Sequence, residues 1–169
     1  ETAVRLGPLA TCFSSLEQML DWIYPLAKII TTNSMGLAGA VLYSSACWNR
    51  ARESKLNLFE AVSAWSKSSE VSREILWAYQ QALWILENNF GQEEMLSFVQ
   101  SFLGQQVIQP TSQISLSILP LMLHNTQDDF LSSLSAAVKI GGELELIGGM
   151  MGCLSALSSD IPTWIQTPY

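Results

Sequence analysis

Hydrophobic residues recur at helical spacing along most of the chain. Between 127 and 140, apolar side chains stand at positions i, i+1, i+4, i+7 and i+8, which places them on one side of an α-helix. No stretch has the strict alternation of a half-buried strand. The pattern therefore predicts an all-α, single-domain helical bundle over residues 1–169. The other segments with helical spacing are 15–30, 34–51, 57–68, 70–88, 93–103 and 112–123.

Two of these segments have features that bear on their place in the bundle. The segment 70–88 is apolar on nearly all sides and contains Trp77 and Trp84, which is typical of a central helix. The segment 15–30 contains Pro25, which has no N–H and whose ring clashes with the preceding turn. We expect the helix to kink or restart there.

Composition and charge exclude several classes of partner. The 169 residues are 49% hydrophobic and 14% charged, with a net charge of −7. An acidic chain does not suit the phosphate backbone of nucleic acids or the anionic surface of a membrane. No apolar run approaches the ~20 residues that a membrane-spanning helix needs. The mean hydropathy of +0.23 is high, which predicts either a rich core or a surface that a partner covers.

The cysteines predict a reducing environment. Cys12, Cys47 and Cys153 are odd in number and have no Cys-x-x-Cys spacing, so neither a disulfide framework nor a zinc site is expected. The opening residues have no apolar export signal, and the expected localisation is cytoplasmic. Cys47 and Cys153 lie in apolar helical segments, which predicts that both are small core residues.

The segment 141–146 has the sequence Gly-Gly-Glu-Leu-Glu-Leu, and small residues follow at 148, 152 and 156. One interpretation is a glycine break before a helix whose acidic first turn suits the helix dipole. The small residues would then let another helix approach closely. The other is a divalent-cation site in which Glu143 and Glu145 are ligands and Gly141 and Gly142 allow a ligand to approach.

This segment also resembles a known motif. Residues 137–152 resemble the closing motif of the ADP-ribosylglycohydrolase family, the group of dinitrogenase reductase-activating glycohydrolase and the crystallin J1-like proteins. In that family an apolar helix precedes Gly-Gly-Asp-Thr-Asp-Thr, and an Ile-Pro and a Trp come later, as in 161–164 here. Three further segments resemble family elements in the same order, and together they cover nearly the whole chain: 3–9, 30–34 and 104–119.

The resemblance implies an all-α fold built around two divalent cations, Mg²⁺ or Mn²⁺. Enzymes of this family cleave the glycosidic bond between ADP-ribose and a modified side chain. The resemblance also implies that the glycine-rich turn at Gly104, Gln105 and Gln106 lies near an ADP-ribose-type ligand.

The departures from the family motif affect its metal ligands. Glu143 and Glu145 replace aspartates, and Leu144 and Leu146 replace threonines and have no ligating atom. The family's Thr-Asp-Asp run belongs to a half of the pattern that this sequence does not include. Mg²⁺ requires near-octahedral oxygen ligands at about 2.0–2.1 Å. We therefore expect a degraded magnesium site and no cofactor, with Mg²⁺ or Mn²⁺ bound only if Glu143 and Glu145 still suffice.

These observations favour a non-catalytic ADP-ribosylglycohydrolase-like protein, a pseudoenzyme that works as a binding, scaffold or regulatory interaction module. A protein partner or self-association would supply its contacts. Trp48 and Trp65 have polar and cationic neighbours, which suggests a partner interface. The alternatives are a metal-dependent ADP-ribosyl hydrolase, whole or split, and a nucleotide sensor that binds ADP-ribose through the turn at Gly104 and the Gly141–Gly142 pair.

Overall fold

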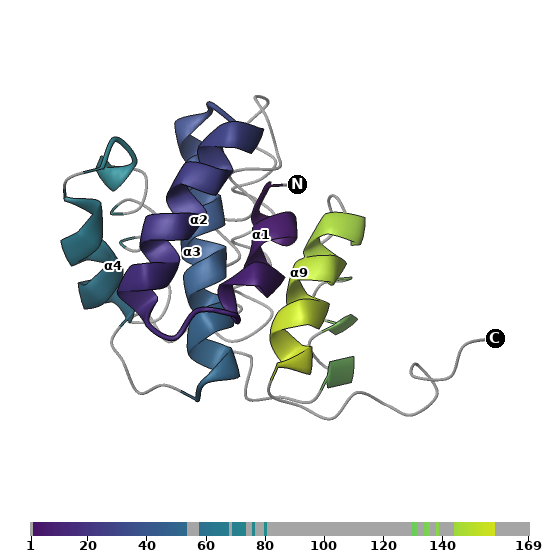
Figure 1. The fold of residues 1–169 in the computed structure, drawn as a ribbon. Helices are drawn as coiled ribbons and strands as arrows, with labels where there is room; N and C mark the ends of the chain where they lie inside the picture. The colour runs from purple at the N-terminus through teal and green to yellow at the C-terminus, as the bar shows by residue number, and fades with distance from the viewer. Residues whose placement is uncertain are drawn as a thin grey trace.

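The computed structural model describes residues 2–53, 58–67, 69–73 and 144–157, together with 76, 80, 130, 131, 134, 135 and 138. Within these residues the regular structure is helical and no strand occurs, which confirms the all-α prediction (Figure 1). The helices are α1 (Thr2–Ala10), α2 (Leu16–Ile30), α3 (Ser34–Ala51), α4 (Leu58–Ser66) and α9 (Leu144–Ala156).

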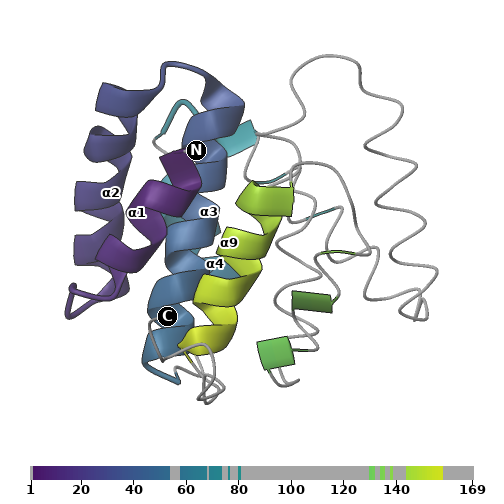
Figure 2. The same cartoon turned by 90° about the vertical axis from the view of Figure 1, so that its right-hand side faces the viewer.

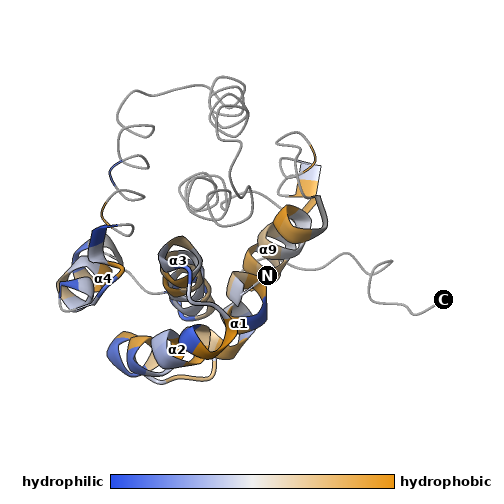
Figure 3. Cartoon of the chain, turned by 90° about the horizontal axis from the view of Figure 1, so that it is seen from above, coloured by the Kyte–Doolittle hydropathy of each residue, from blue (hydrophilic) through white to orange (hydrophobic). Residues whose placement is uncertain are grey.

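The central helix of the described part is α3. It packs against α1, α2, α4 and α9, which surround it when the molecule is seen from above (Figure 3). Every residue from Leu37 to Trp48 is buried, including Ser45, whose hydroxyl donates to the Val41 carbonyl at 2.7 Å. The apolar spacing predicts one buried face, but neighbours on several sides bury this stretch all round.

Side-chain caps set the starts of α2 and α3. The Ser15 hydroxyl accepts from the Gln18 N–H at 3.2 Å. The Asn33 side chain accepts from the N–H groups of Met35 at 2.9 Å and Gly36 at 3.2 Å. Each cap satisfies backbone donors that have no partner within the helix, and such a cap contributes about 1 kcal/mol. The predicted starts of both helices agree with the structure to within one residue.

Pro25 does not restart α2, which is continuous from Leu16 to Ile30. The side chain of Pro25 is exposed. The carbonyl of Asp21, which loses its helical donor to the proline, therefore lies on a side of the helix that water reaches. A helix interrupted by proline needs no restart where the freed carbonyl faces solvent.

The C-terminal end of α3 contacts the turn between α1 and α2. The Trp48 indole N–H donates to the Phe13 carbonyl at 3.0 Å, and the Arg52 guanidinium donates to the Thr11 carbonyl at 3.3 Å. The same guanidinium lies 5.1 Å from the centre of the Trp48 ring, within the range of a cation–π contact. These contacts hold the first three helices together at this end.

Glu53 follows the end of α3 in the left-handed region, with φ of 47°. A side chain other than glycine is strained there. We expect Glu53→Gly to be about 1 kcal/mol more stable than Glu53→Ala, because both remove the carboxylate but only glycine relieves the strain. Urea unfolding of the two variants measures this difference. Equal midpoints would contradict a strained left-handed terminus.

The last described helix, α9, packs beside α1 and α3 (Figures 1 and 2). Its buried residues Ile147, Met150, Met151 and Leu154 supply the apolar contacts. The small residues of this helix do not bring a helix backbone close to them. A Cβ on Gly152 would lie 3.6 Å from a Leu134 methyl group, and one on Gly148 would meet no atom within 4 Å. Within the described residues, Gly148 and Gly152 thus show no close approach of another helix backbone, and the close crossing on residues 148, 152 and 156 stays a prediction.

The remaining predicted helices are described in part or not at all. Residues 72, 73, 76 and 80 are helical, as are 130, 131, 134, 135 and 138. The segments 93–103 and 112–123 lie outside the described residues. In the part of the chain that the structure describes, no helix has the length and apolar character needed to cross a membrane.

Candidate functional site

The residues proposed from sequence for a metal and a ligand fall mostly outside the described part of the chain. Glu145 is the second residue of α9. Among the described residues, no group of three His, Cys, Asp or Glu side chains is placed to hold a metal ion. The other predicted residues lie outside the description: Gly104, Gln105, Gln106, Gly141, Gly142 and Glu143.

The two tryptophans predicted at a partner interface make contacts inside the chain. Trp48 is only 7% exposed and donates its N–H to Phe13. Trp65 is half-buried, donates its N–H to the Asp21 carboxylate at 3.3 Å and packs edge-on against the Tyr24 ring at 5.4 Å between centroids. Their polar neighbours in the sequence therefore do not mark an exposed surface, and the partner prediction for them gains no support.

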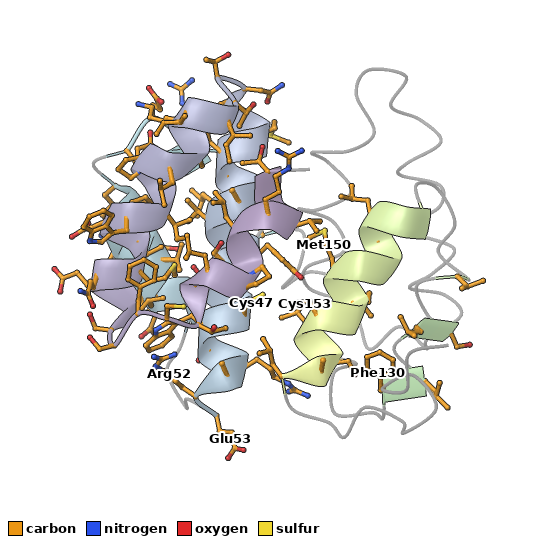
Figure 4. All side chains as sticks on the ribbon, turned by 45° about the vertical axis from the view of Figure 1, so that its right-hand side comes forward. Cys47, Arg52, Glu53, Phe130, Met150 and Cys153 are labelled. Carbon is orange, nitrogen blue, oxygen red and sulfur yellow. The ribbon has the colours of Figure 1, made fainter. Side chains whose placement is uncertain are left out.

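A different cluster joins three helices at the centre of the described part. Tyr43 and Cys47 lie on α3, Met150 and Cys153 on α9, and Gly7 on α1; we call this cluster the thiol junction (Figure 4). The Tyr43 ring is fully buried, and its hydroxyl donates to the Met150 carbonyl at 3.0 Å. Cys47 and Cys153 face each other where α3 and α9 meet (Figure 4), and each affects the acidity of the other.

Helical spacing aligns the members of the junction. Tyr43 and Cys47 are four residues apart on α3, and Met150 and Cys153 are three apart on α9, so each pair lies on one side of its helix. Gly7 allows α1 to approach this side of α3. A Cβ at Gly7 would lie 2.7 Å from Tyr43 Cδ1 and 3.1 Å from Cys47 Sγ, closer than a side chain tolerates.

Burial and hydrogen bonding shift the pKa values of the three titratable groups in the junction, and not all in the same direction. Burial raises the pKa of the Tyr43 hydroxyl. The pKa of Cys47 is raised by the hydrogen bond with Cys153 and by burial. The thiol of Cys47 donates to Cys153 and lowers the pKa of Cys153. Because the single hydroxyl proton of Tyr43 is directed at Met150, Cys47 is the donor that stabilises a Cys153 thiolate.

Access to the two thiols also differs. Cys47 is fully buried, as the sequence predicts for a core residue, whereas Cys153 is half-buried on α9. The more acidic thiol is therefore the one that solvent reaches. The sequence pattern does not link the two cysteines, because they belong to separate helices. Helical spacing shows which residues lie on one side of the same helix, but not which residues of two helices meet.

A second feature is an exposed apolar stripe on α2. Trp22, Pro25 and Ile29 stand at i, i+3 and i+7 on one side of the helix; we call them the α2 stripe. Trp22 is 59% exposed and Ile29 is 82% exposed. Trp22 is the exposed tryptophan among the described residues.

The neighbouring side of α2 is occupied by α4 and the residues after it. Asp21 and Tyr24 contact Trp65, and the Lys28 ammonium is 2.8 Å from the Glu70 carboxylate. These contacts fix the rotation of α2 relative to α4. The α2 stripe therefore lies on a different side of α2 from the residues that contact Trp65 and Glu70.

Comparison with known proteins found no match: no family model, no curated protein and no solved structure matches this chain. The structure therefore defines the class of the protein as all-α and nothing narrower.

Proposed function

We propose that this chain is a non-catalytic ADP-ribosylglycohydrolase-like protein that works as a protein-binding module through the α2 stripe. The observation that supports this most directly is the exposure of Trp22 and Ile29, at 59% and 82%. Tryptophan is among the residues most enriched in the energetic centres of interfaces. Large apolar side chains gathered on one face commonly indicate a contact surface.

The surroundings of the stripe suit a protein better than nucleic acid or lipid. Charged side chains flank its apolar centre: Glu17 and Asp21 on the first half of α2, and Lys28 on the second. An apolar centre with a polar rim is the usual anatomy of a protein interface. The net charge of −7 disfavours polyanions and anionic membranes.

The residues of the stripe themselves suit one partner in particular, which is a second copy of the chain. In an antiparallel pair of α2 helices, Trp22 of one copy meets Ile29 of the other, and the same contact repeats about the two-fold axis. Such self-complementarity is what a symmetric dimer requires. Because each copy carries a charge of −7, salt should strengthen the association by screening the repulsion.

The non-catalytic part of the proposal rests on the resemblance and its departures. Leu144 and Leu146 offer no oxygen where the family motif has threonine, and Glu143 and Glu145 lengthen the side chains that would reach a metal. Mg²⁺ tolerates little change in ligand distance. These substitutions support a surface function over hydrolysis.

Sedimentation velocity of the full chain from micromolar to submillimolar concentration tests the binding surface. We expect a dimer that forms more readily as salt is raised, and Trp22→Ala should weaken it at least about tenfold, as for an interface hot spot. Ala64→Ser is the control, an exposed position on α4 outside the stripe and its charged flank that keeps the net charge, and it should leave dimerisation nearly unchanged. A wild-type chain that stays monomeric throughout would overturn self-association.

Calorimetric titration of ADP-ribose, with and without Mn²⁺, tests the other part of the proposal. We expect no heat of binding under either condition. Metal-dependent binding at micromolar strength would overturn the non-catalytic assignment in favour of a hydrolase, and metal-independent binding would favour a nucleotide sensor. Both results are independent of the sedimentation result.

A further inference from the structure

We propose that Cys47 and Cys153 are a redox-responsive pair that low-molecular-weight disulfides, such as oxidised glutathione, convert into an intramolecular disulfide between α3 and α9. The inference does not depend on the function proposed for the α2 stripe. It assigns a modification site to the thiol junction, where the sequence predicts only two inert core residues.

The fold places the two cysteines next to each other on neighbouring helices. Cys47 and Cys153 come from helices far apart in the sequence, yet the two residues lie beside each other where α3 meets α9 (Figure 4). The hydrogen bond from Tyr43 to the Met150 carbonyl joins the same two helices one turn away from Cys153. The two helices are thus held together beside the cysteines, and a disulfide forms when the two sulfurs approach to about 2.05 Å.

Access assigns the two cysteines different roles. Cys153 is half-buried, so it is the member of the pair that solvent reaches. Cys47 has no exposed surface, and Tyr43 and Gly7 lie against it. An external disulfide therefore reacts first at Cys153, and Cys47 is placed to react only with that residue.

The chemistry balances in two exchange steps. The Cys153 thiolate attacks one sulfur of oxidised glutathione, forms a mixed disulfide and releases one glutathione thiolate. Cys47 then loses its proton to solvent or to that thiolate, and its sulfur attacks the Cys153 sulfur. The Cys47–Cys153 bond forms and the second glutathione leaves. The two protein thiols lose two electrons, and one glutathione disulfide becomes two glutathione thiols.

The bond would join α9 covalently to the central helix. A cross-link that closes a loop of about 100 residues restricts the unfolded chain strongly, and the expected rise in melting temperature is about 10 °C. A disulfide at this place would therefore convert a helix held by noncovalent contacts into a fixed part of the bundle.

The test uses the full chain with Cys12→Ser, which removes the exposed thiol and leaves only the pair. The protein is equilibrated in buffers of defined glutathione ratio, quenched with acid, alkylated and measured by intact mass. We expect the pair to lose two hydrogen atoms together, with non-reducing peptide mapping that joins the peptides of Cys47 and Cys153. The oxidised protein should melt about 10 °C above the reduced protein.

Two further samples separate the roles of the cysteines. Cys47→Ala in the same background should accumulate the mixed disulfide on Cys153, because no second thiol displaces glutathione. In the chain unfolded by urea, glutathione should attach to Cys47 and Cys153 equally. A preference for Cys153 that appears only in the folded chain is then due to the fold, whatever the stability of the variant. Two thiols that stay free in the folded chain, or a mixed disulfide that persists while Cys47 is present, would overturn the proposal.

Discussion

Replacing Gly7 with alanine should destabilise the protein by about 2 kcal/mol, the upper range of the cost of overpacking less the helical gain of alanine. The new methyl group would lie 2.7 Å from Tyr43 Cδ1 and 3.1 Å from Cys47 Sγ. Both neighbours are fully buried, so neither side chain has room to move aside. Overpacking of this kind typically costs about 1–3 kcal/mol, occasionally more, and it outweighs the gain of roughly 1 kcal/mol that alanine normally brings to a helix.

The matched control is Gly149→Ala on α9. A Cβ there meets no atom within 4 Å, so this variant keeps the helical gain without a clash. Urea unfolding at neutral pH should place the two alanine variants on opposite sides of the wild type. Two stabilised variants would show that α1 does not pack against Tyr43 and Cys47 as closely as the structure has it.

Removing the Tyr43 hydroxyl should have the second-largest effect, and the effect should depend on pH. Tyr43→Phe keeps the ring but loses the hydrogen bond to the Met150 carbonyl, which costs about 1–2 kcal/mol at neutral pH. Burial raises the pKa of Tyr43 above its ordinary value of 10.0. The folded state therefore keeps the phenolic proton at a pH where the unfolded chain releases it.

The sign of the pH dependence follows from that difference. The contribution of Tyr43 to stability is complete below pH 10.0 and declines above it, by about 1.4 kcal/mol per pH unit, because the unfolded state then binds fewer protons. The phenylalanine variant has no such proton. Urea unfolding between pH 8 and pH 11 should show the gap between wild type and variant narrowing above pH 10. Parallel curves would mean that the Tyr43 hydroxyl is hydrated.

The pattern of apolar residues was sufficient for much of the helical structure. The predicted segments 15–30 and 34–51 agree closely with α2 and α3, because each has apolar spacing and a capping residue at its start. The helix α1 was not predicted from spacing. Gly7 and Pro8 weaken its helical propensity, and its packing against α3 outweighs that weakness.

The sites were less accessible to prediction. Trp48 and Trp65 have the sequence neighbours of surface residues, but their N–H groups bond within the chain. Trp22 lies in an apolar stretch of the sequence, yet it is 59% exposed. Helical spacing shows which residues share a side of one helix, and it does not show which side another helix will cover.

By itself, the sequence determined that the chain is helical, acidic and rich in apolar residues, and where two of its helices start. Those properties depend on spacing, capping and charge, which act over a few residues. Only the tertiary structure decided that Cys47 meets Cys153, that Gly7 must lack a side chain, and that Trp22 faces outward. These features depend on contacts between helices that are distant in the chain. Spacing, capping and charge do not determine which side of a helix another helix covers, and only the packing of the whole bundle does.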